Sequence, residues 1–231
     1  MKFLLLFVLY FPSAFGLECK WWQIKVSEAS VNNHQRQGVN VKNHPRTEHC
    51  RSKWPNADVY IKQFKDEQSI STARNKFKKW TRNEIKILLE IFSDLPRWTA
   101  LENYTFVRAL NSNIKGNPAA SDIKSKSIII YDQFFNENNK SSIIVHESAH
   151  HIYQNLGPAG VRKFSDLSGW DLEVDKNGKV FEIPPKSLLK PDSSVSKDED
   201  FSNHVEEYFH NPRSHKIRYP NLHEFLKGKL E

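Results

Sequence analysis

The chain has 231 residues, of which 38% are hydrophobic and 12% aromatic, enough for one sizeable packed core. Eight glycines and 11 prolines exclude collagen-like and flexible-linker architectures, and two cysteines exclude a disulfide-dense scaffold or a four-thiolate zinc site. The formal net charge of +7 favours an anionic partner, so its distribution along the chain matters.

The N-terminus has the pattern of a secretory signal peptide. A basic start at Met1 and Lys2 precedes a continuous apolar run over residues 3–11, and the small residues Ala14 and Gly16 follow. We predict a signal peptide over residues 1–16, cleaved after Gly16, and the alternative is an uncleaved anchor. The run is shorter than the ~20 apolar residues that span a bilayer, and no later segment is longer. We therefore expect a secreted or periplasmic protein that is not an integral membrane protein.

Residues 17–57 form a polar, turn-rich basic segment that we expect to be loop-like; whether it is a removable pro-segment stays open. In an oxidising compartment Cys19 and Cys50 are natural disulfide partners, and their bond would close a loop of about 30 residues worth roughly 3 kcal/mol. Two free thiols are the alternative if the protein is not exported.

The positive charge is concentrated in the first third of the mature chain. Residues 17–82 hold 14 Lys and Arg against 6 Asp and Glu, whereas residues 83–231 hold 19 against 21. The basic part also contains Trp21, Trp22, Trp54 and Trp80. This pattern predicts either a docking surface for an anionic cell-surface polymer, over residues 17–82, or merely a solvated basic face. No nucleic-acid-binding motif is present, so we expect no nucleic-acid partner.

Residues 58–231 are expected to form one domain, and several of its elements can be predicted. A capping box formed by Thr81 and Glu84 predicts the start of an amphipathic helix that ends before Pro96. The other predicted elements are a short strand at Val59–Ile61, a basic helix at Ser71–Trp80, a strand at Ser127–Tyr131 and a loop at Pro184–Ser196.

The strongest chemical signal is an H-E-x-x-H motif, His146-Glu147-Ser148-Ala149-His150. The surrounding residues 143–156 lack Gly and Pro, which predicts a helix. Ser141 and Ser142 are candidate N-caps, and Gly157-Pro158 would end the helix.

On that helix the two histidines fall about 40° apart, with Glu147 flanking them. Both imidazoles can then bind one Zn²⁺ while Glu147 takes a proton from a zinc-bound water. His151 points away from the pair and is not expected to be a ligand. The opposite face carries apolar residues that would pack in the core, namely Val145, Ala149, Ile152 and Leu156. The alternative is a polar helix face whose histidines are only solvated.

A catalytic zinc site needs a third protein ligand. No third histidine follows at the metzincin spacing, where Leu156 and Gly157 stand. The remaining candidates lie in residues 198–210, which read as a second helix with one polar and one apolar face. The polar face carries Glu199, Asn203, Glu206 and His210, and the apolar face carries Phe201, Val205, Tyr208 and Phe209.

With its H-E-x-x-H motif, long connection and Glu199-Asp200-Phe201 segment followed by Tyr208-Phe209, the chain resembles the gluzincin metallopeptidases. It is most similar to the branch that contains the anthrax lethal factor catalytic domain and the Pro-Pro endopeptidases. The resemblance covers residues 80–215 and rests on two short motifs. It implies an α+β, zincin-like metallopeptidase fold with a small mixed sheet and two active-site helices. It also implies that Glu199 is the third ligand.

The chain departs from the family pattern at two points. Asn203 stands where the family has a second Glu, so Glu206 is a candidate for that function or for the third ligand itself. The family often has a Tyr before the third ligand, and this Tyr stabilises the oxyanion. In this chain no Tyr lies between Tyr153 and Tyr208, so the oxyanion-stabilising residue is unassigned. The candidates for it are Tyr208, His204 and His210.

The expected function is that of a secreted zinc metalloendopeptidase. One Zn²⁺ held by His146, His150 and Glu199 would activate water, with Glu147 as general base. An extended peptide or protein substrate would pair with the strand at residues 128–131 if that strand lies at a sheet edge, the alternative being an ordinary core strand. Two other functions fit the same residues: a non-catalytic zinc-stabilised binding protein, and a cell-wall amidase.

Overall fold

The computed structural model describes residues 18–26, 29–31, 34–36, 39–41, 44–46, 49–54, 57–66, 76–99, 104–112 and 114–231. Contacts between Cα atoms divide the chain into two units, Met1–Ala57 and Asp58–Glu231. The predicted signal peptide lies outside the described residues. Within the described ranges, no helix has the length and apolar character needed to cross a membrane.

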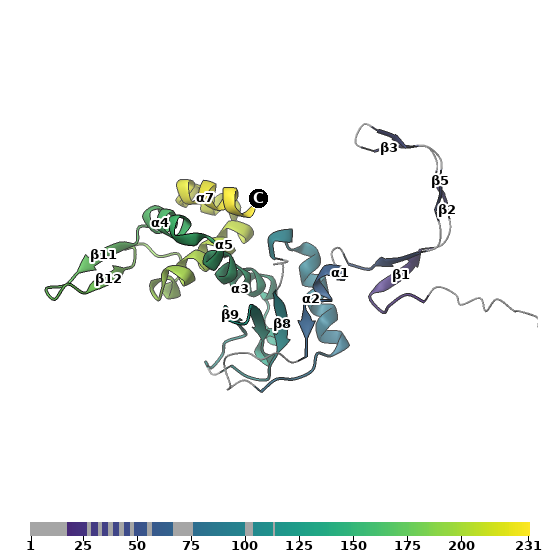
Figure 1. The fold of residues 1–231 in the computed structure, drawn as a ribbon, viewed down its shortest axis with the longest axis horizontal. Helices are drawn as coiled ribbons and strands as arrows, with labels where there is room; N and C mark the ends of the chain where they lie inside the picture. Colours follow the sequence, from purple (N-terminus) through teal and green to yellow (C-terminus); the bar gives the residue numbers. More distant parts are fainter. Residues whose placement is uncertain are drawn as a thin grey trace, which may run out of the picture. The chain divides into compact units, whose positions relative to one another are not determined.

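The described residues of the N-terminal unit contain short antiparallel strand pairs (Figure 1). The prediction of a loop-like segment is therefore wrong for these residues, because strands of three or four residues are too short for a pattern that distinguishes them from a turn-rich loop. The predicted disulfide between Cys19 and Cys50 is confirmed, and it ties the first described residues to the last strand of the unit. The pairs are β1 (Gln23–Val26) with β6 (His49–Ser52), β2 (Ala29–Val31) with β5 (His44–Arg46), and β3 (His34–Arg36) with β4 (Val39–Val41).

A four-stranded mixed sheet lies in the second unit, in the order β7-β8-β10-β9. Its strands are β7 (Phe64–Lys65), β8 (Thr105–Arg108), β9 (Ala119–Asp122) and β10 (Ser127–Ile130). β8 runs parallel to β7 and to β10, and β9 runs antiparallel to β10. The strand predicted at Ser127–Tyr131 is confirmed, but its expected place at the sheet edge is wrong. β10 is paired on both sides, and among the described residues β7 and β9 form the two edges of the sheet.

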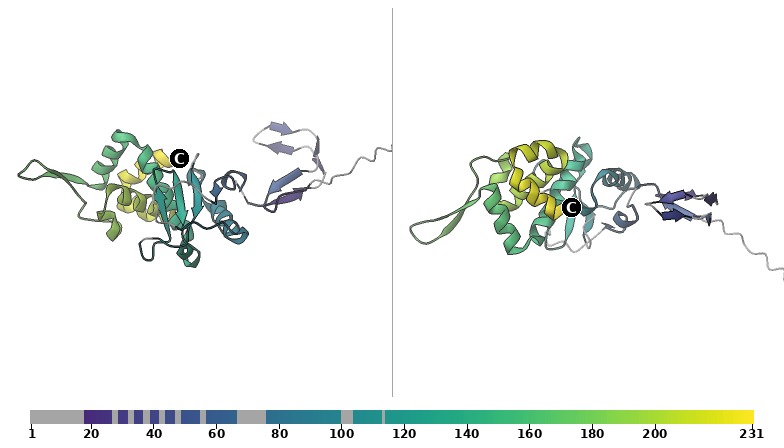
Figure 2. Two further views of the ribbon diagram at one scale, coloured as in Figure 1. Left: turned by 60° about the horizontal axis from the view of Figure 1, so that its bottom comes forward. Right: turned by 90° about the horizontal axis from the view of Figure 1, so that it is seen from above.

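Helices dominate the rest of this unit, and the predicted mixture of helices and a small mixed sheet is confirmed. Figure 2 shows the β11–β12 hairpin extending away from the helices. The helices are α1 (Ala57–Tyr60), α2 (Arg82–Asp94), α3 (Lys140–Asn155), α4 (Gly157–Ser168), α5 (Lys197–His210), α6 (Pro212–Arg218) and α7 (Pro220–Leu230). The short 3-10 helices are η1 (Arg97–Thr99), η2 (Asp132–Asn136) and η3 (Pro191–Ser194), and the hairpin is β11 (Asp171–Val174) with β12 (Val180–Ile183).

The capping box at the start of α2 is confirmed. Thr81 Oγ1 accepts a hydrogen bond from the Glu84 backbone N–H, and the Thr81 N–H donates to the Glu84 carboxylate. The buried face of α2 then packs on the sheet, because the Phe92 ring lies 5.0 Å from that of Phe106 on β8. The helix thus follows the predicted pattern, and it covers the β7–β8 side of the sheet.

Two local predictions before α2 are wrong. Residues 57–60 form a helical turn in place of the strand predicted at 59–61, and Tyr60 is buried there by stacking on Phe92 at 4.0 Å. Of the helix predicted at 71–80, residues 71–75 lie outside the described residues and residues 76–80 are extended. Lys78 donates its N–H to the Arg108 carbonyl at the end of β8. Both segments take their conformation from partners distant in sequence, which local periodicity cannot show.

Candidate metal centre

The two helices that carry the H-E-x-x-H motif and Glu199 pack directly against each other. α3 contacts α5 along its length and also contacts the edge strand β9 (Figure 1). α3 begins one residue before the predicted caps, with Asn139 in the N-cap position, so Ser141 and Ser142 belong to its first turn. Val145 and Ala149 are fully buried, as the predicted apolar face requires. The opposite face of α3 is therefore turned toward α5.

Three of the predicted residues come together between these helices. His146, His150 and Glu199 each offer one ligand atom, and these atoms all lie within 4.8 Å of one another. Glu199 approaches both imidazoles on the same side: one carboxylate oxygen is 3.3 Å from His146 Nε2 and the other is 3.7 Å from His150 Nε2. The three residues form a group that can bind a metal ion.

The other nitrogen of each imidazole faces a second carboxylate. His150 Nδ1 lies 2.9 Å from Asp198, and His146 Nδ1 lies 3.5 Å from Glu206. Metal-binding histidines usually donate their distal N–H to a carboxylate, which fixes the tautomer and the ring orientation. Glu206 therefore lies on the outer side of His146, whereas Glu199 lies on the side that both Nε2 atoms share. This difference favours Glu199 over Glu206 as the third ligand.

These acidic neighbours change the proton affinity of the histidines. Burial alone would lower the pKa of His146, but hydrogen bonds to Glu199 and Glu206 outweigh it and raise that pKa to about 10. For His150 burial also opposes protonation, and the hydrogen bond to Asp198 raises the pKa above its usual value. The contact with His146 in turn lowers the pKa of Glu199. Such an anionic surrounding attracts a cation, either a proton or a metal ion.

Glu147 lies apart from this group but within its electrostatic reach. Its charge raises the pKa of both His146 and His150, and its side chain is only 8% exposed. The hydroxyl of Ser121, on the edge strand β9, lies 2.7 Å from a Glu147 carboxylate oxygen. The same hydroxyl is 2.7 Å from the Glu147 backbone carbonyl. Ser121 thus orients the carboxylate, and it was not predicted because a lone serine in a polar stretch carries no sequence signal.

Asp198 and Lys190 are two further residues of the site that sequence reasoning missed. Lys190 donates to Glu206 across 2.6 Å, so it balances the charge of the carboxylate beside His146. Asp198 directly precedes Glu199, and its position in the first turn of α5 made it resemble an ordinary helix-stabilising acid. The adjacency to Glu199 was the one available signal for it.

Other predicted candidates lie elsewhere. Asn203 is fully buried and donates to Asp192 and Ser193 of η3, so it fastens that turn to α5. Tyr208 donates to Glu231 near the C-terminus. Among the oxyanion candidates, His204 is buried beside His215, with 3.1 Å between their ring nitrogens, and His210 is exposed at the end of α5.

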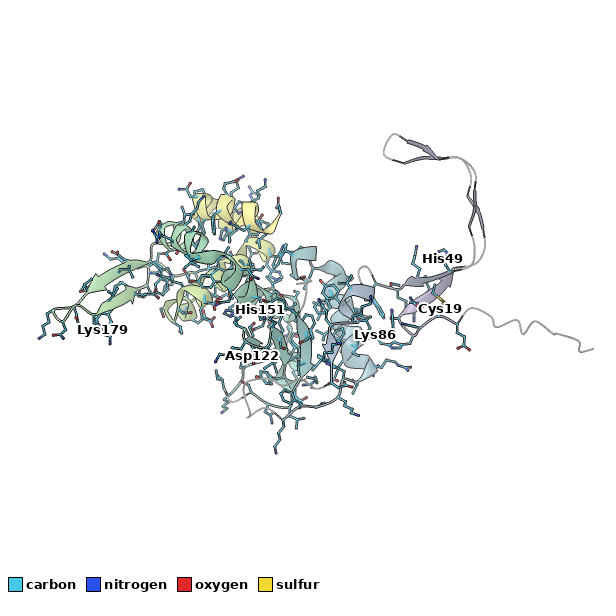
Figure 3. The ribbon with its side chains drawn as sticks, viewed as in Figure 1. Cys19, His49, Lys86, Asp122, His151 and Lys179 are labelled. Atoms are coloured by element: carbon cyan, nitrogen blue, oxygen red, sulfur yellow. A yellow bond between two sulfur atoms is a disulfide. The ribbon has the colours of Figure 1, made fainter. Side chains whose placement is uncertain are left out.

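His151 lies in different surroundings from His146 and His150, the other two histidines of this helix. It is fully buried, its ring centre lies 4.1 Å from that of Tyr104, and burial lowers its pKa to about 4. Figure 3 labels His151 and Asp122, the last residue of the edge strand, whose charge partly opposes this lowering of the His151 pKa. His151 is not part of the candidate metal-binding group.

Comparison with known proteins gives no match. No family model fits the chain, and no curated protein and no solved structure is significantly similar to it. The function is therefore inferred from the chemistry of the site.

Proposed function

We propose that the chain is a zinc-dependent metallopeptidase of the gluzincin type. The observation that carries this proposal is the convergence of both Nε2 atoms and the Glu199 carboxylate, while each Nδ1 atom faces a separate acidic side chain. Two imidazoles and one carboxylate are a ligand set that catalytic zinc uses, and three protein ligands leave a position for water. His146, His150 and Glu199 would hold the ion.

When bound, zinc would supply a water of lowered pKa and a Lewis acid for the substrate carbonyl. Glu147 would take the proton from the attacking water and later pass it to the leaving amine. Two features support this function for Glu147: it lies outside the group of three ligands, and Ser121 holds its carboxylate. Asp198 and Glu206 would accept the Nδ1–H of the two imidazoles, which leaves each Nε2 free to bind the ion and fixes the ring orientation.

The edge strand β9 is the proposed binding place for the scissile segment of the substrate. β9 ends the sheet order, it contacts α3, and its Ser121 touches Glu147. An extended peptide can add to such an edge through main-chain hydrogen bonds. This arrangement of a small mixed sheet, an edge strand and two site helices supports a zincin-like fold, and it favours a peptide substrate over the alternative of a cell-wall amidase.

The N-terminal unit is proposed to dock the enzyme on an anionic cell-surface polymer. Its described residues bring three tryptophans together, with ring centres 5.6 Å apart for Trp21 and Trp22 and 6.4 Å apart for Trp21 and Trp54. Lys20 lies 5.0 Å above the Trp22 ring. Trp80, in contrast, packs on Phe64 in the second unit, so the proposed docking surface is confined to the first.

Metal content and peptide cleavage test the enzymatic proposal together. Zinc is measured by mass spectrometry, and cleavage is measured on a peptide library. We expect Glu147→Gln to retain zinc and lose cleavage by at least about a hundredfold, the size typical of general acid–base catalysis. The surface variant Glu224→Gln is the matched control and should behave like the wild type. Zinc that stays bound while the wild type cleaves no peptide would overturn the proposal and support a zinc-stabilised binding protein.

A further inference from the structure

The β11–β12 hairpin exposes an unusual amount of apolar surface. All of its strand residues are exposed, and among the described residues it carries half of the exposed large hydrophobic side chains. Figure 3 shows Lys179 at its outer end, far from the helices. An isolated two-stranded hairpin is marginal in water, and exposed apolar clusters commonly mark interaction sites. The exposed apolar residues are Leu172 (60%), Val174 (60%), Val180 (56%), Phe181 (40%) and Ile183 (38%).

The base of this hairpin is attached to the helical turn that carries Glu199. Lys197, the first residue of α5, forms an ion pair with Glu182 on β12 at 2.8 Å. Trp170, just before β11, donates its indole N–H to Asp200 at 2.9 Å. The base of the hairpin therefore lies beside the helical turn that carries Glu199.

The two faces of β11 differ in chemistry. Side chains alternate along a strand, so Leu172 and Val174 lie on one face and Asp171 and Glu173 on the other. Across the hairpin, Val174 is paired with Val180 and Leu172 with Glu182 on one face, whereas Ile183 and Phe181 lie opposite the two acidic residues on the other face. A strand added beside β11 would therefore place alternate side chains against apolar and acidic neighbours.

The outer edge of β11 offers main-chain groups for such a strand. The Asp175 N–H donates to the Lys179 carbonyl at 2.9 Å, which marks this pair as hydrogen-bonded within the hairpin. Hydrogen-bonded and non-bonded pairs alternate in an antiparallel ladder. The main-chain groups of Leu172 and Val174 consequently point outward, and no strand pairs with this edge among the described residues.

We propose that the outer edge of β11 binds an extended segment of the polypeptide substrate in which apolar and basic residues alternate. The apolar side chains would contact Leu172 and Val174, and the basic side chains would lie opposite Asp171 and Glu173. A second copy of the chain is a poor occupant, because pairing β11 with itself brings acidic side chains together on one face, and like charges directly opposite destabilise a sheet. That the segment belongs to a substrate rests on the proposed peptidase function.

Binding is tested with a fluorescein-labelled peptide of four Val-Lys repeats, and a peptide of four Val-Glu repeats serves as the charge control. The full chain with Glu147→Gln is used, so that cleavage cannot interfere, and binding is followed by fluorescence anisotropy. Glu173→Lys replaces the acidic side chain that would lie opposite a basic residue of the peptide. Val174→Pro removes a main-chain N–H that points outward from β11. Val180→Pro is the matched control, because its N–H points outward on the opposite edge.

We expect the Val-Lys peptide to bind and the Val-Glu peptide not to bind. Glu173→Lys and Val174→Pro should each raise the Kd about tenfold or more, whereas Val180→Pro should leave it within about twofold. Equal binding of both peptides, equal loss in both proline variants, or no binding would overturn the proposal. So would a dimer, seen by light scattering, that Val174→Pro dissociates.

A separate measurement links the surface to catalysis. Attaching the Val-Lys segment to a peptide that the wild type cleaves should raise kcat/KM, and Glu173→Lys should abolish the gain while leaving cleavage of the unextended peptide unchanged. A gain that persists in Glu173→Lys would refute the link to the substrate. If the wild type cleaves no peptide, the proposed function fails, and the anisotropy measurement still decides whether β11 binds the segment.

Discussion

The proposed support of the His150 ring by Asp198 can be tested without changing any of the three proposed ligands. The Asp198 carboxylate lies 2.9 Å from His150 Nδ1, and its second oxygen accepts a hydrogen bond from Gln154 at 3.3 Å. Asp198→Asn keeps the size of the side chain but removes the charge that holds the His150 ring. The loss of such an outer carboxylate typically weakens metal binding 10- to 100-fold, or about 1.4 to 2.7 kcal/mol.

The assay is a zinc titration of the full chain against a chromophoric chelator at neutral pH. Asp166→Asn, on the exposed side of α4, removes the same charge away from the site and is the control. An affinity for Asp198→Asn equal to that of the control would refute the proposed support of His150. A loss as complete as that of Glu199→Ala would show instead that Asp198 is itself a ligand.

Three other predictions concern the stability of the fold, measured by urea unfolding with the disulfide intact. Thr81→Ala removes the N-cap of α2 and should lower the free energy of unfolding by about 1 kcal/mol; no change would contradict the capping box seen here. Phe201 on α5 is fully buried, and its ring centre is 5.2 Å from that of Phe164. Phe201→Ala should therefore lower the free energy of unfolding by about 3–5 kcal/mol. A decrease below about 1 kcal/mol would be inconsistent with this packing. Burial lowers the pKa of His204 to about 3 and that of His215 to about 4, so the unfolded chain binds protons first as the pH falls below the ordinary histidine value of 6.5. The free energy of unfolding should therefore fall between about pH 6.5 and pH 4, by up to about 1.4 kcal/mol per pH unit for each histidine, and His215→Gln should flatten this slope. An unchanged slope in that variant would exclude His215 as its source.

Prediction from the sequence succeeded where a local rule acts. The capping box of Thr81 and Glu84 and the periodicity of α5 both specify a helix through neighbours within a few turns. It failed at residues 59–61 and 76–80, where Tyr60 stacks on Phe92 and Lys78 pairs with β8. In both failures a partner distant in the chain decides the conformation.

The order of the strands in the sheet could not be predicted from the sequence either. The apolar run at 127–130 is equally consistent with an edge strand or an interior one, and only the pairing of β10 with β8 and β9 shows that it is interior. The edge proposed to bind substrate is consequently β9, and no periodic pattern in the sequence marks its polar Ser121.

The sequence by itself determined that His146 and His150 share one helix face with Glu147 beside them, because that geometry follows from the pitch of a helix. Through a resemblance, the sequence also indicated Glu199 as the third ligand, but it left Glu206 open as an alternative. Only the tertiary structure separated the two, since the packing of α5 on α3 turns Glu199 toward both Nε2 atoms and Glu206 toward an Nδ1 atom. Which nitrogen a carboxylate faces depends on the relative placement of two helices, and no spacing within one segment encodes it.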